Sequence, residues 1–144
     1  MKILVIHGPN LNLLDKREAS HYGSLSSEAI VSLLQLKYPE VVFDYFQSNG
    51  EGELILAIQK ADEQYQGIII NPGGYSHTSV AIRDALELCR VPKVEVHLSN
   101  IYNREVFRQT LITAGACDAV ISGAKVFSYI AAATIIRDLH GSKL

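Results

Sequence analysis

The sequence has few of the residues that hold disulfide-linked or zinc-dependent domains together. Among its 144 residues only Cys89 and Cys117 are cysteines, and they lie 28 positions apart without a CxxC motif or a histidine at ligand spacing. This pattern disfavours a disulfide framework and a zinc site, so we expect two reduced, buried thiols and no metal. A chain of this length buries a sufficient apolar core without such links. We therefore expect a single domain over residues 1–144.

The sequence also lacks a basic cluster and a long apolar run. Thirteen Lys and Arg against fifteen Asp and Glu give a net charge of −2, and the scattered basic residues disfavour nucleic-acid binding. The longest run without a charge or strong turn-former, residues 129–136, is much shorter than the roughly 20 residues that span a bilayer. Residues 1–6 are too short an apolar stretch for a secretion signal. We expect a soluble, cytoplasmic protein that does not contact membranes.

Motifs of common nucleotide-binding and covalent enzymes are missing as well. No GxGxxG opens the first expected helix and no GxxxxGK[ST] occurs, which disfavours dinucleotide and P-loop nucleotide binding. Asn71 stands where a phosphoacceptor domain needs an aspartate, and Ser99 lacks the GxSxG turn of a nucleophilic serine. The lysines lie at expected strand starts, helix ends or loops, so we expect no buried Schiff-base lysine.

Short β-branched runs alternate along the chain with segments of helical spacing. The expected strands are residues 3–6, 41–46, 67–70, 93–98 and 119–121. Helices are expected after Ser26, after Asn49 and after Ser79, and a closing helix covers residues 127–139. This alternation predicts an α/β fold, a flavodoxin-like three-layer αβα sandwich with a five-stranded parallel sheet.

Polar residues crowd the carboxyl ends of the expected strands, where open parallel sheets bind their ligands. They occupy residues 7–12, 47–51, 71–77 and 97–100. We therefore expect the functional site at this edge. Two of these segments also carry helix-start signals, because residues 48–51 match a capping box and Ser76 or Thr78 can cap the third helix.

Residues 15–23 follow the first expected strand without a periodic apolar face, so we expect a mobile loop over the site. Tyr22 in this segment acts as a base near neutrality only if its ordinary pKa of about 10 falls by roughly 2–3. A nearby guanidinium lowers a phenol's pKa, and Arg17 and Arg108 are the candidates. The residues alone leave open the alternative that Arg17 is a solvated charge and Tyr22 a packing residue.

Glu95 is a carboxylate inside a strand that should be buried on both faces. It alternates with Val94 and Val96, and an unpaired buried carboxylate is costly. His97, two residues further on, lies on the same side of the strand. A Glu95–His97 pair would explain the carboxylate and would set the imidazole tautomer.

Four separated blocks follow one another in the chain. They read GPNLNLLDKREASHYG (8–23), FQSNGEGELI (46–55), INPGGYSHTSVAIRDAL (70–86) and VEVHLSNIYNREVFR (94–108). On these blocks the sequence resembles, over nearly its whole length, the type II 3-dehydroquinate dehydratases. The resemblance implies anti elimination of water from 3-dehydroquinate to 3-dehydroshikimate through an enolate, in the shikimate pathway of aromatic amino-acid biosynthesis. It implies no metal, nucleotide or other cofactor.

The resemblance implies catalytic roles for five residues. Tyr22, as a phenolate, would remove a C2 proton, and Arg17 would depress its pKa. Asn10 would hold a water against the enolate oxygen, where charge develops. His97 would protonate the departing C1 hydroxyl, and Glu95 would orient His97.

The resemblance also implies how the substrate is bound. Asn71 would contact the carboxylate and the C1 hydroxyl, while His77 and Arg108 would hold the other hydroxyls. The backbone N–H groups of Leu98 and Ser99 precede a short helix whose N-terminus favours the carboxylate. Plainer alternatives are an Asn-Pro turn for Asn71, a polar helix entry for His77 and a solvated charge for Arg108.

The family resemblance further implies a homo-oligomer, a dodecamer of four trimers, in which Asp84 reaches into a neighbouring subunit's pocket. The alternative for Asp84 is an exposed helix carboxylate beside Arg83. Arg104 would support the loop and its tyrosine.

Two positions depart from the family pattern, since Asp15 stands where glycine is usual and Ala19 where proline is common. They predict altered loop kinetics in a working enzyme. Two functional alternatives stay open, a noncatalytic flavodoxin-like module that binds a small molecule and another cofactor-free enolising lyase or isomerase.

Overall fold

The computed structural model describes residues 1–16 and 26–142 of the chain. Its five strands form one parallel sheet in the order β2-β1-β3-β4-β5. They are β1 (Lys2–His7), β2 (Val42–Gln47), β3 (Gly67–Asn71), β4 (Lys93–His97) and β5 (Ala119–Ser122). The flavodoxin-like sheet predicted from the alternating pattern is confirmed, and each strand end lies within one residue of its predicted place.

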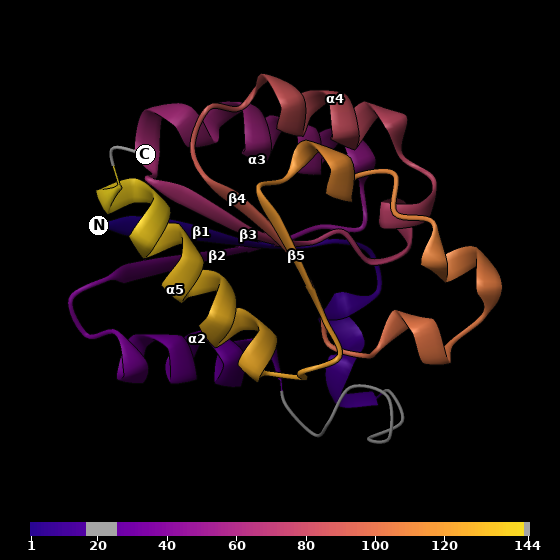
Figure 1. Ribbon diagram of the computed structural model, residues 1–144, viewed down its shortest axis with the longest axis horizontal. Helices are drawn as coiled ribbons and strands as arrows, with labels where there is room; N and C mark the ends of the chain where they lie inside the picture. Colours follow the sequence, from indigo (N-terminus) through magenta and orange to yellow (C-terminus); the bar gives the residue numbers. More distant parts are fainter. Residues whose placement is uncertain (17–25, 143–144) are drawn as a thin grey trace.

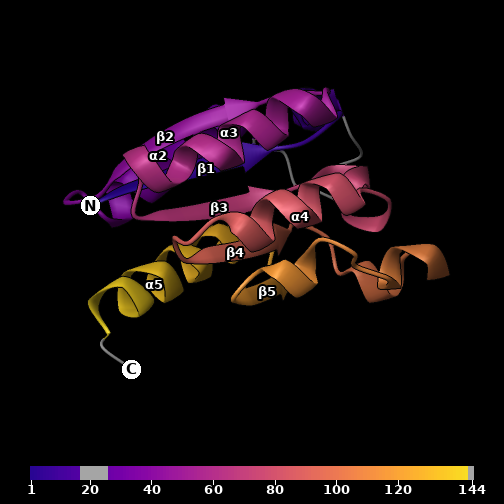
Figure 2. The same ribbon diagram turned by 90° about the horizontal axis from the view of Figure 1, so that it is seen from above.

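Helices cover both faces of the sheet (Figures 1 and 2). One layer contains α2 (Ser27–Lys37) and α5 (Phe127–Gly141), and the other contains α3 (Glu51–Gln64) and α4 (Val80–Leu88). Side chains alternate along the strands, so Val5 and Ile69 pack towards α2 and α5 while Ile6 and Ile70 pack towards α3 and α4. The sheet therefore lies between two apolar layers.

In the part of the chain that the structure describes, five short 3-10 helices follow β1, β3 and β4. They are η1 (Leu11–Lys16), η2 (Gly73–His77), η3 (Ile101–Asn103), η4 (Val106–Gln109) and η5 (Ala114–Ala116). The first of them includes Asp15 and Lys16, where a loop is expected, while the rest of the expected loop lies outside the described residues. η1 to η4 lie in the connections that leave the carboxyl edge of the sheet, whereas η5 packs against α4 before β5.

The capping box predicted at residues 48–51 is wrong. Helix α3 has Gly50 as its N-cap and no side-chain cap. Ser48 still belongs to the strand pairing, because its N–H donates to His7 O at 3.1 Å. Its hydroxyl accepts from the Gly50 N–H and donates to Glu53, so it braces the helix start from outside.

The cap predicted for the third helix is also misplaced. Ser79 caps α4, and its hydroxyl accepts the Ile82 N–H at 2.9 Å. Ser76 and Thr78 instead donate to Gly73 O and Gly74 O inside η2. The helix itself begins at Val80, directly after Ser79 as expected, so only the capping residue differs.

Two expectations about reactive side chains also need correction. Cys89 and Cys117 are free thiols, but only Cys89 is buried, because Cys117 lies half-buried in the connection before β5. Lys93 is buried where no buried lysine is expected, and its Nζ donates to Cys89 O and Val91 O at 2.8 and 3.3 Å. It lies at the amino end of β4, away from the polar edge. Within residues 1–16 and 26–142, no helix combines the length and hydropathy needed to cross a bilayer.

Candidate active site

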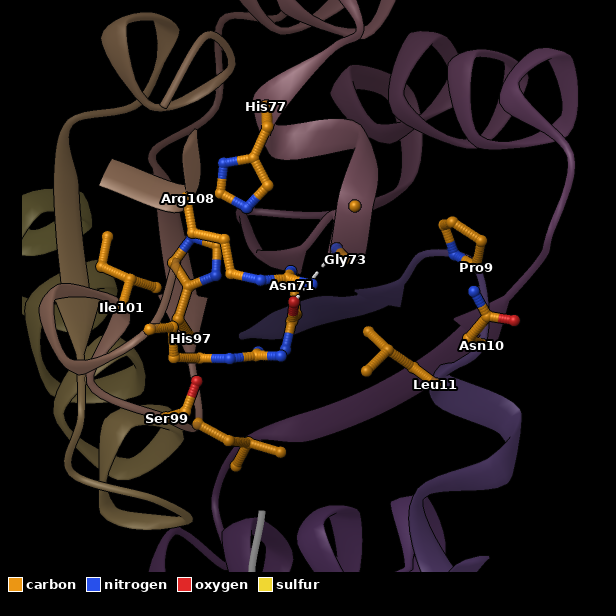
Figure 3. A pocket seen from close by; sticks show the side chains of 13 residues that line it. Pro9, Asn10, Leu11, Asn71, Gly73, His77, His97, Ser99, Ile101 and Arg108 are labelled. Atoms are coloured by element: carbon orange, nitrogen blue, oxygen red, sulfur yellow. Dashed lines mark hydrogen bonds between the residues drawn. The ribbon is translucent and has the colours of Figure 1, made fainter. Parts of the chain in front are cut away.

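A cavity of about 130 Å³ opens at the carboxyl ends of β1, β3 and β4 (Figure 3). This volume is about ten times the roughly 10–15 Å³ that one water needs, so the cavity accommodates a small molecule. It lies where the strand order reverses, which is the place predicted from the sequence. The predicted substrate and catalytic residues that line it are Asn10, Asn71, His77, His97, Leu98, Ser99 and Arg108, and Arg104 lines it too.

Glycine at two positions lets the connections after β1 and β3 meet. A Cβ on Gly8 would lie 2.2 Å from Pro72 O, and the Gly8 N–H donates to Asn71 O at 2.8 Å. Gly73 has a φ of +61°, and a Cβ there would lie 3.0 Å from Pro9 O. No other residue fits this crossing without a shift of the backbone. The close approach brings Asn10 and Asn71 to the same cavity.

Asn10 is held in a specific backbone geometry at the cavity wall. Its φ of 68° lies in the left-handed region, which asparagine tolerates better than most residues. Its N–H donates to Asn49 Oδ1 at 3.0 Å, and Gln47 Nε2 donates to the same oxygen at 3.2 Å. Asn10 lies on the opposite side of the cavity from His97 and Arg108 (Figure 3).

His97 and Glu95 form a buried pair at the end of β4. His97 Nε2 lies 2.7 Å from Glu95 Oε1, and Glu95 Oε2 accepts a 2.6 Å hydrogen bond from Thr113 Oγ1. Glu95 and Thr113 have no exposed surface, so both carboxylate oxygens are satisfied by protein groups alone. Because Glu95 occupies Nε2, Nδ1 is the ring nitrogen that can exchange a proton with a ligand. The pair has the geometry predicted from the two-residue spacing.

His77 and Arg108 lie beside His97 on one side of the cavity (Figure 3). His77 Nδ1 donates to Thr110 O at 2.9 Å, and its ring stacks on that of His97 with 6.5 Å between centroids. Burial lowers the pKa of His77, and the charges of His97 and Arg108 lower it further. Arg108 Nε donates to Glu105 Oε2 at 2.7 Å. The Thr110 contact fixes the ring so that Nε2 remains as its second hydrogen-bonding atom.

The helix that follows Leu98 and Ser99 adds no free N–H group of its own to the anion site predicted at these two residues. It is η3, a 3-10 helix of three residues. The Ile101 N–H donates to Ser122 Oγ at 3.1 Å, and the Tyr102 N–H donates to Asn100 Oδ1 at 3.1 Å. Its first N–H groups are therefore already bonded, although Leu98 and Ser99 line the cavity.

The model for the family described as Dehydroquinase class II matches residues 1–137. The chain belongs to this family. It is 47% identical over 139 residues to the 3-dehydroquinate dehydratase of Thermotoga petrophila, with 95% of each chain covered. To that of Aliarcobacter butzleri it is 52% identical over 131 residues, covering 90% of this chain and 80% of the relative. The crystal structure of a type II dehydroquinase from Butyrivibrio crossotus matches with a TM-score of 0.90 at 42% identity, covering 95% and 97% of the two chains.

Not every predicted site residue of this class II dehydroquinase lies at the cavity. Arg17 and Tyr22 lie outside the described residues. Asp84 is exposed on α4 and does not line the cavity, so its predicted contact with a neighbouring subunit stays a prediction. In the part of the chain that the structure describes, no three His, Cys, Asp or Glu side chains gather as a metal site.

Sequence reasoning missed three buried polar residues of this dehydroquinase that contact site residues. Thr113 binds Glu95, Tyr129 binds Asn71, and His7 binds Tyr129. The sequence offered one indication for His7, because it lies at the end of the first expected strand. Thr113 and Tyr129 had none, because they lie in a connection and in an apolar helix far along the chain.

Proposed function

We propose that this chain dehydrates 3-dehydroquinate to 3-dehydroshikimate by anti elimination through an enolate, as a step of the shikimate pathway. Family membership supports the dehydratase activity. The observation that carries the proposal is the buried Glu95–His97 pair, whose histidine lines the same cavity as Asn10 and Asn71. This arrangement offers a proton donor beside hydrogen-bonding groups for a hydroxylated acid.

The acid step belongs to His97. Glu95 accepts the Nε2–H, so a proton bound at Nδ1 is the one delivered to the C1 hydroxyl as the C–O bond breaks. The hydroxyl leaves as water, and the electron pair of the enolate forms the new double bond. His97 returns to its neutral form with Glu95 still on Nε2.

The base step belongs to Tyr22, which as a phenolate removes the C2 proton on the opposite face. Arg17 supplies the positive charge that favours the phenolate. The carbonyl oxygen gains negative charge as the enolate forms, and a water held by Asn10 donates a hydrogen bond to it. A single tyrosine and a single histidine thus divide the two proton transfers.

Binding uses the remaining residues of the cavity. The substrate carboxylate contacts the backbone N–H groups of Leu98 and Ser99 and the Asn71 side chain. His77 and Arg108 hold the ring hydroxyls, with Arg108 adding a positive charge for an acidic substrate. The site requires no cofactor.

The active form is a cytoplasmic homo-oligomer, a dodecamer of four trimers. In each trimer the exposed Asp84 of α4 reaches the cavity of a neighbouring subunit. Light scattering on the purified protein tests this assembly.

The activity is tested by adding 3-dehydroquinate to the purified protein and following the ultraviolet absorbance of the conjugated enone. We expect a rise with the wild type and none above background with Tyr22→Phe, which keeps the ring and removes only the ionisable oxygen. Calorimetric binding of 3-dehydroquinate should be nearly unchanged in that variant. Binding without turnover in the wild type would instead favour a noncatalytic binding module, and normal turnover by Tyr22→Phe would assign the base to another residue.

A further inference from the structure

A line of buried neutral groups lies behind Asn71, on the α5 side of the sheet. Asn71 Nδ2 donates to Tyr129 Oη at 3.4 Å, and Tyr129 Oη lies 2.7 Å from His7 Nε2. On the far side of the ring, His7 Nδ1 lies 3.2 Å from Tyr45 Oη. His7 and Tyr129 have no exposed surface, and Asn71 is 4% exposed. His7 and Asn71 are paired neighbours at the ends of β1 and β3.

The Asn71 amide favours one direction for the protons of this line. An amide N–H of Asn71 is a donor, so Tyr129 Oη accepts it and gives its own hydrogen to His7 Nε2. His7 Nε2 is then an acceptor, and the proton of the neutral ring lies on Nδ1, directed to Tyr45. Burial lowers the pKa of His7 to about 3 and raises the pKa of Tyr129, so both groups are neutral near pH 7.

Asn71 is fixed at its other end by the backbone. Its Oδ1 accepts the Gly73 N–H at 3.1 Å, the contact drawn as a dashed line in Figure 3. A carboxamide turned by 180° would set Nδ2 against the Gly73 donor and Oδ1 beside Tyr129. The two contacts therefore choose one orientation, in which the second Nδ2–H is the donor left for a ligand in the cavity.

We propose that Tyr129 and His7 are positioning residues that hold the Asn71 carboxamide with its N–H towards the substrate. Tyr129 acts directly on the amide nitrogen, and His7 fixes the hydroxyl hydrogen of Tyr129 so that its oxygen always accepts. The inference rests on the proposed function only in taking Asn71 as a substrate contact. An anionic carboxylate needs a donor at this position, whereas a turned amide would present an acceptor and repel it.

The kinetic test compares Tyr129→Phe with Tyr38→Phe. Tyr38 is also buried and its hydroxyl also bonds to α5, through Thr134 Oγ1 at 2.6 Å, but it does not touch Asn71. A hydrogen bond of this kind makes a roughly fivefold to tenfold difference, so KM for 3-dehydroquinate should rise by about that factor in Tyr129→Phe with kcat within about threefold. Tyr38→Phe should keep the wild-type KM. An unchanged KM in a folded Tyr129→Phe protein, or the same rise in both variants, overturns the proposal.

Variants of His7 test its proposed role in fixing the hydroxyl hydrogen of Tyr129. His7→Leu removes the acceptor for the Tyr129 hydroxyl and should raise KM, whereas His7→Gln can offer an amide oxygen and should bring KM back towards the wild type. Equal KM values for His7→Leu and the wild type contradict the role of His7.

Nitrogen NMR of the histidine rings tests the arrangement without turnover or added substrate. At pH 7 in the wild type, His7 should show a protonated Nδ1 and an unprotonated Nε2, and Tyr129→Phe should change the Nε2 signal. The opposite tautomer overturns the proposal. Because this readout needs no activity, failure of the dehydratase assay leaves it standing, and failure of the NMR test leaves the dehydratase assay standing.

Discussion

His7 ends β1 and His97 ends β4, and both side chains are buried, with 0% and 7% of their surface exposed. They leave the sheet on opposite faces, since His7 meets Tyr129 of α5 while the alternation along β4 turns His97 and Glu95 away from that helix. Within residues 1–16 and 26–142, the hydrogen-bonding partners of His7 are neutral, two phenols and a serine. The ring of His97 is bonded to a carboxylate.

The difference shows that the partner, more than burial, decides what a buried histidine can do. The Glu95 carboxylate would balance a positive charge on the His97 ring, which fits the acid role proposed for this residue. Among the described residues no carboxylate bonds to His7, and burial lowers its pKa to about 3. His7 therefore serves as a fixed hydrogen-bond acceptor and donor rather than as an acid.

The largest effect should separate the two histidines by rate. His97→Gln removes the proposed general acid, and kcat should fall by roughly 10²–10⁴-fold with little change in KM. His7→Gln should lower kcat by less than about threefold, because the Asn71 contact acts mainly on binding. Steady-state kinetics on the two matched variants measures both values. Similar losses of kcat would show that the two rings do not differ in this way.

The next largest effect should come from Thr113, which donates a hydrogen bond to Glu95 of the Glu95–His97 pair. Thr113→Val removes the hydroxyl that donates to Glu95 Oε2 and leaves a buried carboxylate oxygen without a partner. The free energy of unfolding should fall by about 3 kcal/mol, and kcat should fall because Glu95 no longer holds the His97 ring in place. Thr113→Ser keeps the hydroxyl and serves as the control. Urea unfolding and kinetics check both, and a Val variant as stable as the Ser variant would remove Thr113 from the account.

The sequence allowed the Glu95–His97 pair to be predicted because backbone geometry alone places residues two apart on the same side of a strand. Asn10 and Asn71 were predictable for a similar reason, since the carboxyl ends of parallel strands share one edge. The sheet order followed from the strict alternation of strands and helices. All of these depend on local geometry that a pattern records.

Thr113, Tyr129 and the cap at Ser79 could not be predicted in this way. Thr113 reaches Glu95 because the Ile112 and Thr113 N–H groups bond to Ser76 O, which folds the connection after β4 back onto η2. Tyr129 reaches Asn71 through the packing of α5 across the sheet. Such contacts depend on tertiary packing, which leaves no periodic signal in the sequence.

The pH dependence of stability should reveal His7 on its own. Between its unfolded pKa of about 6.5 and its folded pKa of about 3, the unfolded chain binds a proton that the native chain does not, so stability falls as pH falls through this window. From pH 6.5 to pH 5 the wild type should lose roughly 2 kcal/mol more than His7→Gln does. Urea unfolding at the two pH values measures the difference. Equal losses would mean that His7 titrates normally in the folded protein.

The smallest effect should come from Tyr45, the residue furthest from Asn71 in the series of hydrogen bonds through Tyr129 and His7. Tyr45→Phe removes the group that accepts from His7 Nδ1, but Ser27 Oγ lies 3.4 Å from the same nitrogen and can replace it. Tyr45 is also 36% exposed, so water can reach it. The free energy of unfolding should fall by about 0.5–1 kcal/mol, and KM should change by less than about twofold. A KM rise as large as in Tyr129→Phe would mean that the hydrogen bonds from Tyr45 to Asn71 act cooperatively. The Tyr45 hydroxyl would then control the Asn71 carboxamide as strongly as Tyr129, which contacts it directly.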